Sequence, residues 1–409
     1  MGERARRVWE TYRGVVLLGV VGVPIGLVVG AVDALFGRTL LAITDLRGAW
    51  PFLLIPLLPV AGALCVWAYG RFGGTTVRGM GLVFDVGHGR EGSIPLRLVP
   101  LVMVSTWLTH LCGGSAGREG VAVQIGATIS HWAGRHLPFR DPGNVFLVVG
   151  MAAGFAGLFR TPLAATLFAL EVLVAGRLEY RALFPALVAS LSASTASGAL
   201  GLEKFEVALC APLQMDAPTL ARLAVAGVAF GVVGGGFAWL LARAKQVLAR
   251  QVVNPVVRVV VVAVPLAVVL LALWQGRYAG LGTNLISAAF SDAPSVMPWD
   301  WALKLALTVL TLAAGFQGGE VTPLFSIGAT LGVVLAEPLG MDPALVAALG
   351  YAAVFGGATN TLLAPALIGA EVFGFGYLPA FFVVCAVAYV FNMDKSIYAL
   401  QGSVWGRRP

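Results

Sequence analysis

The sequence predicts an all-α polytopic membrane protein made of two inverted-topology repeats with broken and tilted helices. Three observations predict this fold: an apolar composition, long apolar stretches from end to end, and a similarity between the two halves of the chain. Hydrophobic residues make up 58% of the 409 residues, and charged residues make up only 11%. Soluble domains carry roughly 25% charged residues, so this composition belongs in a lipid bilayer.

Apolar stretches long enough to cross, or half cross, a hydrocarbon core of about 30 Å recur along the whole chain. The clearest are residues 14–36, 51–70, 219–242, 256–275 and 377–391. No soluble domain of any size remains between them. The first stretch follows four arginines within residues 1–13, but its length and the many later stretches favour a retained helix over a cleaved signal.

An internal repeat sets the predicted architecture. Shifting the chain by 200 residues places 150–172 over 350–372, and eleven of the 23 aligned positions are identical. The match includes Glu171 and Glu371, and chance similarity between two apolar segments seldom pairs two carboxylates. We interpret these two glutamates as structural caps or interface residues rather than as part of a transport site.

The two copies are expected to have opposite orientations, as residues 1–205 and 206–409. Basic residues near the N-terminus, in the connection 243–258 and at the C-terminal end mark these segments as cytoplasmic. The basic residues of that connection and of the C-terminal end are Arg243, Lys245, Arg250, Arg258, Arg407 and Arg408. The acidic stretch 203–216 is interpreted as external, which inverts the second repeat relative to the first.

Two glycine-dense segments interrupt the apolar pattern at matching places in the repeats. They are GGSAGREG at 113–120 and GFQGGEVTP at 315–323, and Gly117 aligns with Gly319 at a shift of 202. Freed backbone groups at membrane depth are tolerated only when they are buried in protein or line a polar cavity. A helix that starts there presents unpaired N–H donors and a positive partial charge. The two breaks therefore predict one shared site for a small anion.

Each break carries a glutamate in an apolar region, Glu119 in the first and Glu320 in the second. Ionisable groups are costly at membrane depth and usually mark ion pathways or proton relays. We expect Glu119, and with it Glu320, to take part in gating and proton coupling. Gly126 and Gly328 are interpreted instead as sites of close helix packing.

Several functional classes find no support. The four histidines and four cysteines form no metal-binding or catalytic pattern, and no nucleotide-binding loop is present, so we expect neither an enzyme nor a cofactor. The net charge of +7 is spread over termini and short connections, which suits lipid headgroups rather than nucleic acid. A secondary transporter or a channel remains.

Four motifs resemble those of the CLC family of chloride channels and chloride/proton antiporters. GGSAGREGV resembles the GREGP signature, whose glutamate is the external gate, here Glu119. Gly79, Met80 and Gly81 stand where the family has GSGIP, with its anion-contacting serine. GGEVTP at 318–323 stands at the GxFxP motif, and Tyr398 matches the tyrosine that closes the site from within.

Departures from these motifs resemble the fluoride-transporting members of the family. Met80 replaces the serine, and Val321 with Thr322 replaces the phenylalanine-containing pattern. The second carboxylate that serves chloride/proton antiporters as an internal proton relay is missing, because Val172 follows Glu171. The fluoride subfamily lacks it as well.

The resemblance implies a fluoride/proton antiporter in which Glu119 is the proton-linked gate and Glu320 is an auxiliary proton group. The expected anion-binding residues are Gly79, Met80, Gly81, Gly117, Arg118, Gly120, Val321, Thr322 and Tyr398. It also implies a homodimer in the inner (plasma) membrane, with both termini cytoplasmic. A chloride/proton antiporter, a passive CLC-type channel and a membrane scaffold without transport stay open as alternatives.

Overall fold

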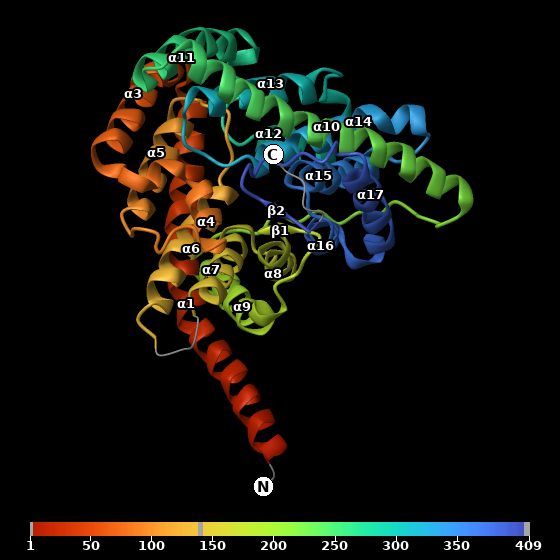
Figure 1. Ribbon diagram of the computed structural model, residues 1–409. Helices are drawn as coiled ribbons and strands as arrows, with labels where there is room; N and C mark the ends of the chain where they lie inside the picture. The colour runs from red at the N-terminus through yellow and green to blue at the C-terminus, as the bar shows by residue number, and fades with distance from the viewer. Residues whose placement is uncertain (1–2, 138–141, 405–409) are drawn as a thin grey trace.

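The computed structural model describes residues 3–137 and 142–404 and shows a bundle of tilted helices (Figure 1). Arg407 and Arg408, used above for orientation, lie outside the described residues, as do the side chains of residues 1–13. Within the described part, six helical stretches are long and apolar enough to cross a membrane. The predicted multi-pass helical fold is confirmed.

The first half of the chain, red to yellow in Figure 1, contains nine α-helices among its described residues. They are α1 (Glu3–Ala49), α2 (Pro51–Leu54), α3 (Leu58–Ala68), α4 (Met80–Gly87), α5 (Leu98–Leu111), α6 (Glu119–Gly134), α7 (Pro142–Phe159), α8 (Pro162–Glu171) and α9 (Leu183–Ala199). Between α3 and α4 lie a π-helical turn, η2 (Tyr69–Gly73), and a 3₁₀ turn, η3 (Gly74–Arg78).

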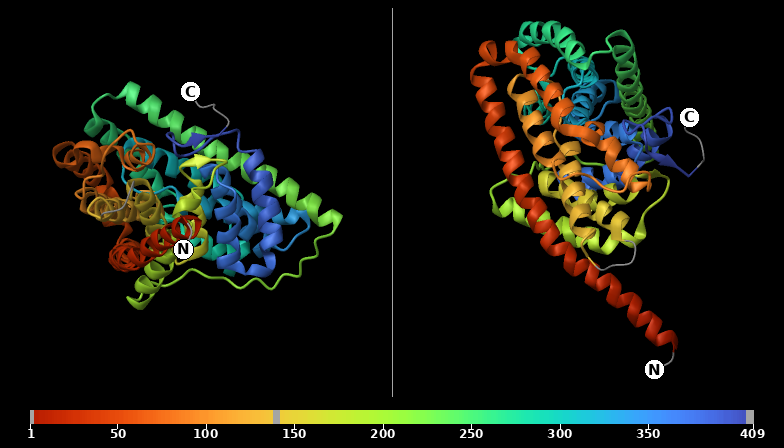
Figure 2. Two further views of the ribbon diagram at one scale, coloured as in Figure 1. Left: turned by 60° about the horizontal axis from the view of Figure 1, so that its bottom comes forward. Right: turned by 60° about the vertical axis from the view of Figure 1, so that its left-hand side comes forward.

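The second half, green to blue, contains α10 (Ala217–Gln251), α11 (Pro255–Ala272), α12 (Thr283–Ser291), α13 (Asp300–Ala314), α14 (Val321–Leu339), α15 (Pro343–Thr359), α16 (Leu363–Phe373) and α17 (Leu378–Val390). The long helices α1 and α10, which open the two halves, lie on different sides of the molecule (Figure 2). Proline occupies the first turn of several helices. The first N–H groups of a helix have no intrahelical acceptor, so proline loses no hydrogen bond at that position. Asp342 and Asn254 cap two of these helices through their side chains.

Glycines allow equivalent helix pairs to pack closely in the two halves. α6 packs on α7, and α14 packs on α15. A Cβ on Gly126 would collide with the carbonyl oxygen of Gly150, and one on Gly328 would collide with that of Gly350. The packing interpretation of Gly126 and Gly328 is therefore confirmed, because any larger residue would separate the two backbones.

Glu171 and Glu371 cap helices of the opposite half. The carboxylate of Glu171 accepts hydrogen bonds from the N–H groups of Leu363 at 3.1 Å and Ala364 at 2.9 Å, at the start of α16. Glu371 accepts from Ala164 at 2.8 Å, at the start of α8. Each half thus caps a helix of the other half with an equivalent glutamate, as the predicted repeat implies. The capping interpretation is confirmed. The division at residues 205 and 206 stays a prediction.

Two parts of the chain differ from the predicted pattern. A small parallel sheet joins β1 (Val174–Ala175) to β2 (Gly402–Ser403) and ties the C-terminal segment to the end of α8. The predicted basic connection 243–258 is mostly helical, because α10 continues to Gln251 through residues of high helix propensity. Only residues 252–254 form the turn into α11.

Candidate functional site

The two glycine breaks meet each other. The N–H of Gly117 donates to the carbonyl of Gly319 at 2.5 Å, and the N–H of Gly319 donates to the carbonyl of Gly117 at 2.8 Å. A Cβ on Gly117 would lie 2.9 Å from the carbonyl oxygen of Gly319, so a side chain at position 117 would push the two segments apart. The pairing brings the first turns of α6 and α14 together, as the shared-site prediction requires.

The carboxylate of Glu119 lies at the N-terminus of α14. Glu119 is fully buried, and its Oε2 accepts hydrogen bonds from the N–H of Thr322 at 3.0 Å and from its hydroxyl at 2.5 Å. The Nε of Arg118 lies 3.6 Å from Oε1. We call this arrangement the Glu119 seat. Its donors and the positive end of the helix dipole suit an anion, and in this structure the side chain of Glu119 is the anion held there.

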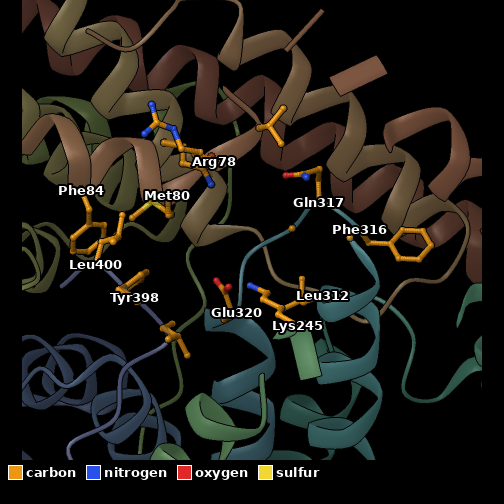
Figure 3. Close-up of a pocket in the computed structure, with 18 residues that line it drawn as sticks. Arg78, Met80, Phe84, Lys245, Leu312, Phe316, Gln317, Glu320, Tyr398 and Leu400 are labelled. Carbon is orange, nitrogen blue, oxygen red and sulfur yellow. The ribbon is translucent and has the colours of Figure 1, made fainter. Parts of the chain in front are cut away.

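A cavity of about 450 Å³ reaches Glu320, the residue that precedes α14 (Figure 3). It is lined from η3, α4, α6, α10, α13, the segment before α14 and the C-terminal segment. Its lining residues include Arg78, Gly79, Met80, Gly81, Phe84, Gln124, Lys245, Gln317, Glu320, Tyr398 and Leu400. In Figure 3 the nitrogen of Lys245 is turned toward the carboxylate of Glu320, and Met80 and Tyr398 lie on another side of the cavity.

The first turn of α4 positions Met80 at the cavity. Gly79 precedes it with φ +51°, a conformation that disfavours a side chain, and it lies close to Gln124 of α6. Arg78 is held away from the helix start by hydrogen bonds to Asp85 at 2.8 Å and Glu91 at 2.6 Å. The α4 N-terminus thus faces the cavity with the thioether of Met80 and with the N–H groups of Met80 and Gly81, for which the described residues provide no acceptor.

The C-terminal segment positions Tyr398. Its side chain is buried, with the ring 5.2 Å from that of Phe84 between centroids. Three residues on, the amide of Gln401 donates to the carbonyl of Val172 at 3.0 Å. The β1–β2 pairing follows directly, so the tyrosine is fixed to the first half of the chain although it lies near the C-terminal end.

The predicted site residues fall into two neighbouring groups. Gly79, Met80, Gly81, Glu320 and Tyr398 line the cavity. The Glu119 seat consists of Glu119, Arg118 and Thr322. Gly120 and Val321 lie next to it in the first turns of α6 and α14, and Gly117 belongs to the backbone pairing of the two breaks. Gly120 joins the groups, since a Cβ there would lie 3.7 Å from a carboxylate oxygen of Glu320.

Sequence reasoning missed several polar groups that are buried or line the cavity. Lys245 was assigned to lipid headgroups, although it lines the cavity. Lys304 is fully buried, and its ammonium donates to the carbonyl of Gly280 at 2.7 Å and to Ser115 of the first break at 2.9 Å. Asp33 is also fully buried, and among the described residues neither of its oxygens has a hydrogen-bond partner. For Lys245, the signal available in the sequence was the position of a basic residue near the end of a predicted helix.

Among the described residues, no group of three or more histidine, cysteine, aspartate or glutamate side chains could hold a metal ion.

The chain is similar to proteins of one known family. A family model described as voltage gated chloride channel matches residues 61–393. A chloride/fluoride channel protein of Pseudomonas syringae pv. tomato is 36% identical over 384 residues, which cover 92% of this chain and 84% of the relative.

Two solved structures are also similar. The crystal structure of a CLC-type fluoride/proton antiporter has a TM-score of 0.93 and 52% identity, and the match covers 95% of this chain and 98% of that one. A slow cyanobacterial Cl⁻/H⁺ antiporter has a TM-score of 0.80 at 20% identity, over 94% of this chain and 96% of that one. At that identity the second comparison supports the fold alone.

Proposed function

Because the chain belongs to the voltage-gated chloride channel (CLC) family, we propose that it is a secondary active transporter that exports fluoride in exchange for protons. The similar antiporter structure, at 52% identity, carries that activity in its description. The observation that supports the mechanism most directly is the Glu119 carboxylate held by Thr322 at the start of α14.

The Glu119 seat links anion movement to proton movement. While it is charged, the Glu119 carboxylate competes with an incoming anion for the N–H and hydroxyl of Thr322. Once it has bound a proton, the side chain loses its attraction for the helix N-terminus and leaves the donors to the anion. Each exchange of places therefore couples one proton-binding event to one anion-binding event. Glu320, which lines the cavity near Gly120, is proposed as the auxiliary proton group.

The anion pathway is proposed to run from the cavity to the seat. The N–H groups of Met80 and Gly81, which follow the turn at Gly79, would receive the anion, and Tyr398 would narrow the passage from the other side. The hydroxyl of Thr322, the backbone at Gly117, Gly120 and Val321 and the cation of Arg118 would stabilise it at the seat. A small, strongly hydrated anion needs donors placed closely enough to replace its water.

Assembly and orientation are further parts of the proposal. The protein is a transporter rather than an enzyme, and it would lie in the cell inner membrane as a homodimer, with both termini cytoplasmic. An apolar groove on α8, α16 and α17 offers a self-association surface, with Leu167, Leu363, Ala366, Leu367, Phe382 and Val383 among its lining residues.

Purified protein in liposomes tests the proposed function. Vesicles are loaded in turn with fluoride and with chloride, and anion efflux and internal pH are recorded together. We expect fluoride to leave much faster than chloride and to drive protons inward. Comparable chloride and fluoride exchange would favour a chloride/proton antiporter, and anion flux without proton movement would favour a passive channel.

A further inference from the structure

A groove between α3 and α5 has features that the transport mechanism does not use. These two helices pack against each other on the outer side of the first half (Figure 1). The groove has a volume of about 650 Å³. Its apolar lining residues include Leu64, Cys65, Ala68, Phe72, Pro100, Leu101, Val104 and Leu108, and its charged ones are Arg71 and Arg97.

Both charges lie at one end of the groove. Arg71 follows the C-terminal end of α3, and Arg97 immediately precedes α5. The opposite end is apolar, with Leu64 and Leu108 among its walls. Leu108 lies eleven positions after Arg97, and at 1.5 Å per helical residue this corresponds to about 16 Å. One leaflet of a bilayer has about the same hydrocarbon depth, half of roughly 30 Å.

Among the described residues, the two arginines of the groove have no ion-pair partner. Arg78 and Arg90, on the neighbouring segment, form ion pairs with Asp85 or Glu91. Among the described residues, neither Arg71 nor Arg97 pairs with a carboxylate. Both side chains are exposed, so an external anion can reach the guanidinium groups. Guanidinium groups bind phosphate oxygens in a bidentate geometry.

Aromatic side chains place this end at the membrane interface. Trp67 and Phe72 are about half exposed and pack edge to face, with centroids 5.9 Å apart. The guanidinium carbon of Arg71 lies 5.6 Å from the Phe72 ring centroid. Tryptophan and arginine at the end of an apolar helix are typical of the headgroup region.

We propose that this groove binds one anionic phospholipid, with its phosphate on Arg71 and Arg97 and an acyl chain lying between α3 and α5. Charge complementarity selects a headgroup with net negative charge, and the apolar length of the groove selects a lipid over a free phosphate ion. The site also adjoins the anion pathway, because an Nη of Arg97 lies beside Gly74, the first residue of η3. That turn leads to Gly79 and Met80.

Native mass spectrometry of the full chain in detergent tests the proposal, with phosphatidylglycerol and phosphatidylcholine added as the two probes. Each basic residue near a membrane surface contributes about 1 kcal/mol toward anionic lipid, so two give about a 30-fold preference for phosphatidylglycerol. Arg71→Gln with Arg97→Gln should abolish this preference. Arg71→Lys with Arg97→Lys keeps the charge and should retain most of it.

Two further variants separate the groove from general surface charge. Arg181→Gln with Arg222→Gln removes two exposed arginines elsewhere and should leave the preference unchanged. Val104→Trp should fill the groove and reduce retention of both lipids. The proposal is overturned if the Arg71 and Arg97 glutamine variant prefers phosphatidylglycerol as strongly as the unaltered protein, or if Val104→Trp retains both lipids unchanged. No transport is measured, so failure here leaves the fluoride proposal untouched.

Discussion

Replacing Glu171 by glutamine perturbs the contact that joins the two halves. Its carboxylate accepts from the N–H groups of Leu362, Leu363 and Ala364 at 3.4, 3.1 and 2.9 Å, and the side chain is buried. Glutamine keeps one acceptor oxygen and turns an NH₂ group toward the remaining N–H donors. Hydrogen bonds to charged groups contribute about 1.5–3 kcal/mol each, so we expect a loss of about 2 kcal/mol in the free energy of unfolding.

The equivalent change in the other half has a smaller expected effect. Glu371 accepts from Leu163 at 3.2 Å and Ala164 at 2.8 Å, one bond for each oxygen. Its side chain is less buried than that of Glu171, and water replaces part of the lost interaction. We expect Glu371→Gln to cost about 1 kcal/mol.

Unfolding by sodium dodecyl sulfate in detergent micelles, followed by tryptophan fluorescence, measures both effects. Glu337→Gln provides the matched control, because Glu337 is exposed near the end of α14 and such surface changes usually stay within about 0.5 kcal/mol. If Glu171→Gln unfolds at the same detergent composition as Glu337→Gln, the capping argument is wrong.

Three further predictions concern selectivity, topology and packing. Met80→Ser returns a hydroxyl donor to the cavity and should narrow the ratio of fluoride to chloride efflux; an unchanged ratio would assign Met80 to packing. In a chain without native cysteines, an impermeant thiol reagent outside the cell should label Glu206→Cys but not Arg250→Cys, and labelling of both would contradict the inversion. Gly328→Ala, which forces a Cβ against the Gly350 carbonyl, should lower thermal stability by several degrees, while Gly236→Ala, with nothing within 4 Å, should not. Equal melting temperatures for these two variants would contradict the packing argument.

Local sequence patterns predicted the parts of the fold that occur once in each of the two repeats. Paired glycines and paired glutamates at a constant shift are unusual in apolar segments, so Gly126, Gly328, Glu171 and Glu371 could be assigned without a structure. The glycine breaks indicated where helices start, because an apolar segment without a break would have continued as one helix.

Long-range packing decided the features that the sequence did not reveal. Lys245 reaches the cavity because α10 is longer than its charge pattern suggested, and no local signal connects it to Glu320. The sequence predicted that the two breaks share one site, but it did not identify Thr322 as the partner of the Glu119 carboxylate. Tyr398 was located through a family motif, whereas the β1–β2 pairing that holds it involves residues more than 200 positions apart.

Proton movement through Glu119→Gln tests the central claim most directly. The amide keeps the volume of the side chain and can still accept from Thr322, but it cannot bind or release a proton. In liposomes with the voltage clamped by an ionophore, an outward fluoride gradient should acidify the interior when the unaltered protein is present. The Gln variant should show no fluoride-driven pH change. Persistent fluoride-driven proton transport in that variant would contradict the account and make Glu320 the first group to examine as the proton carrier.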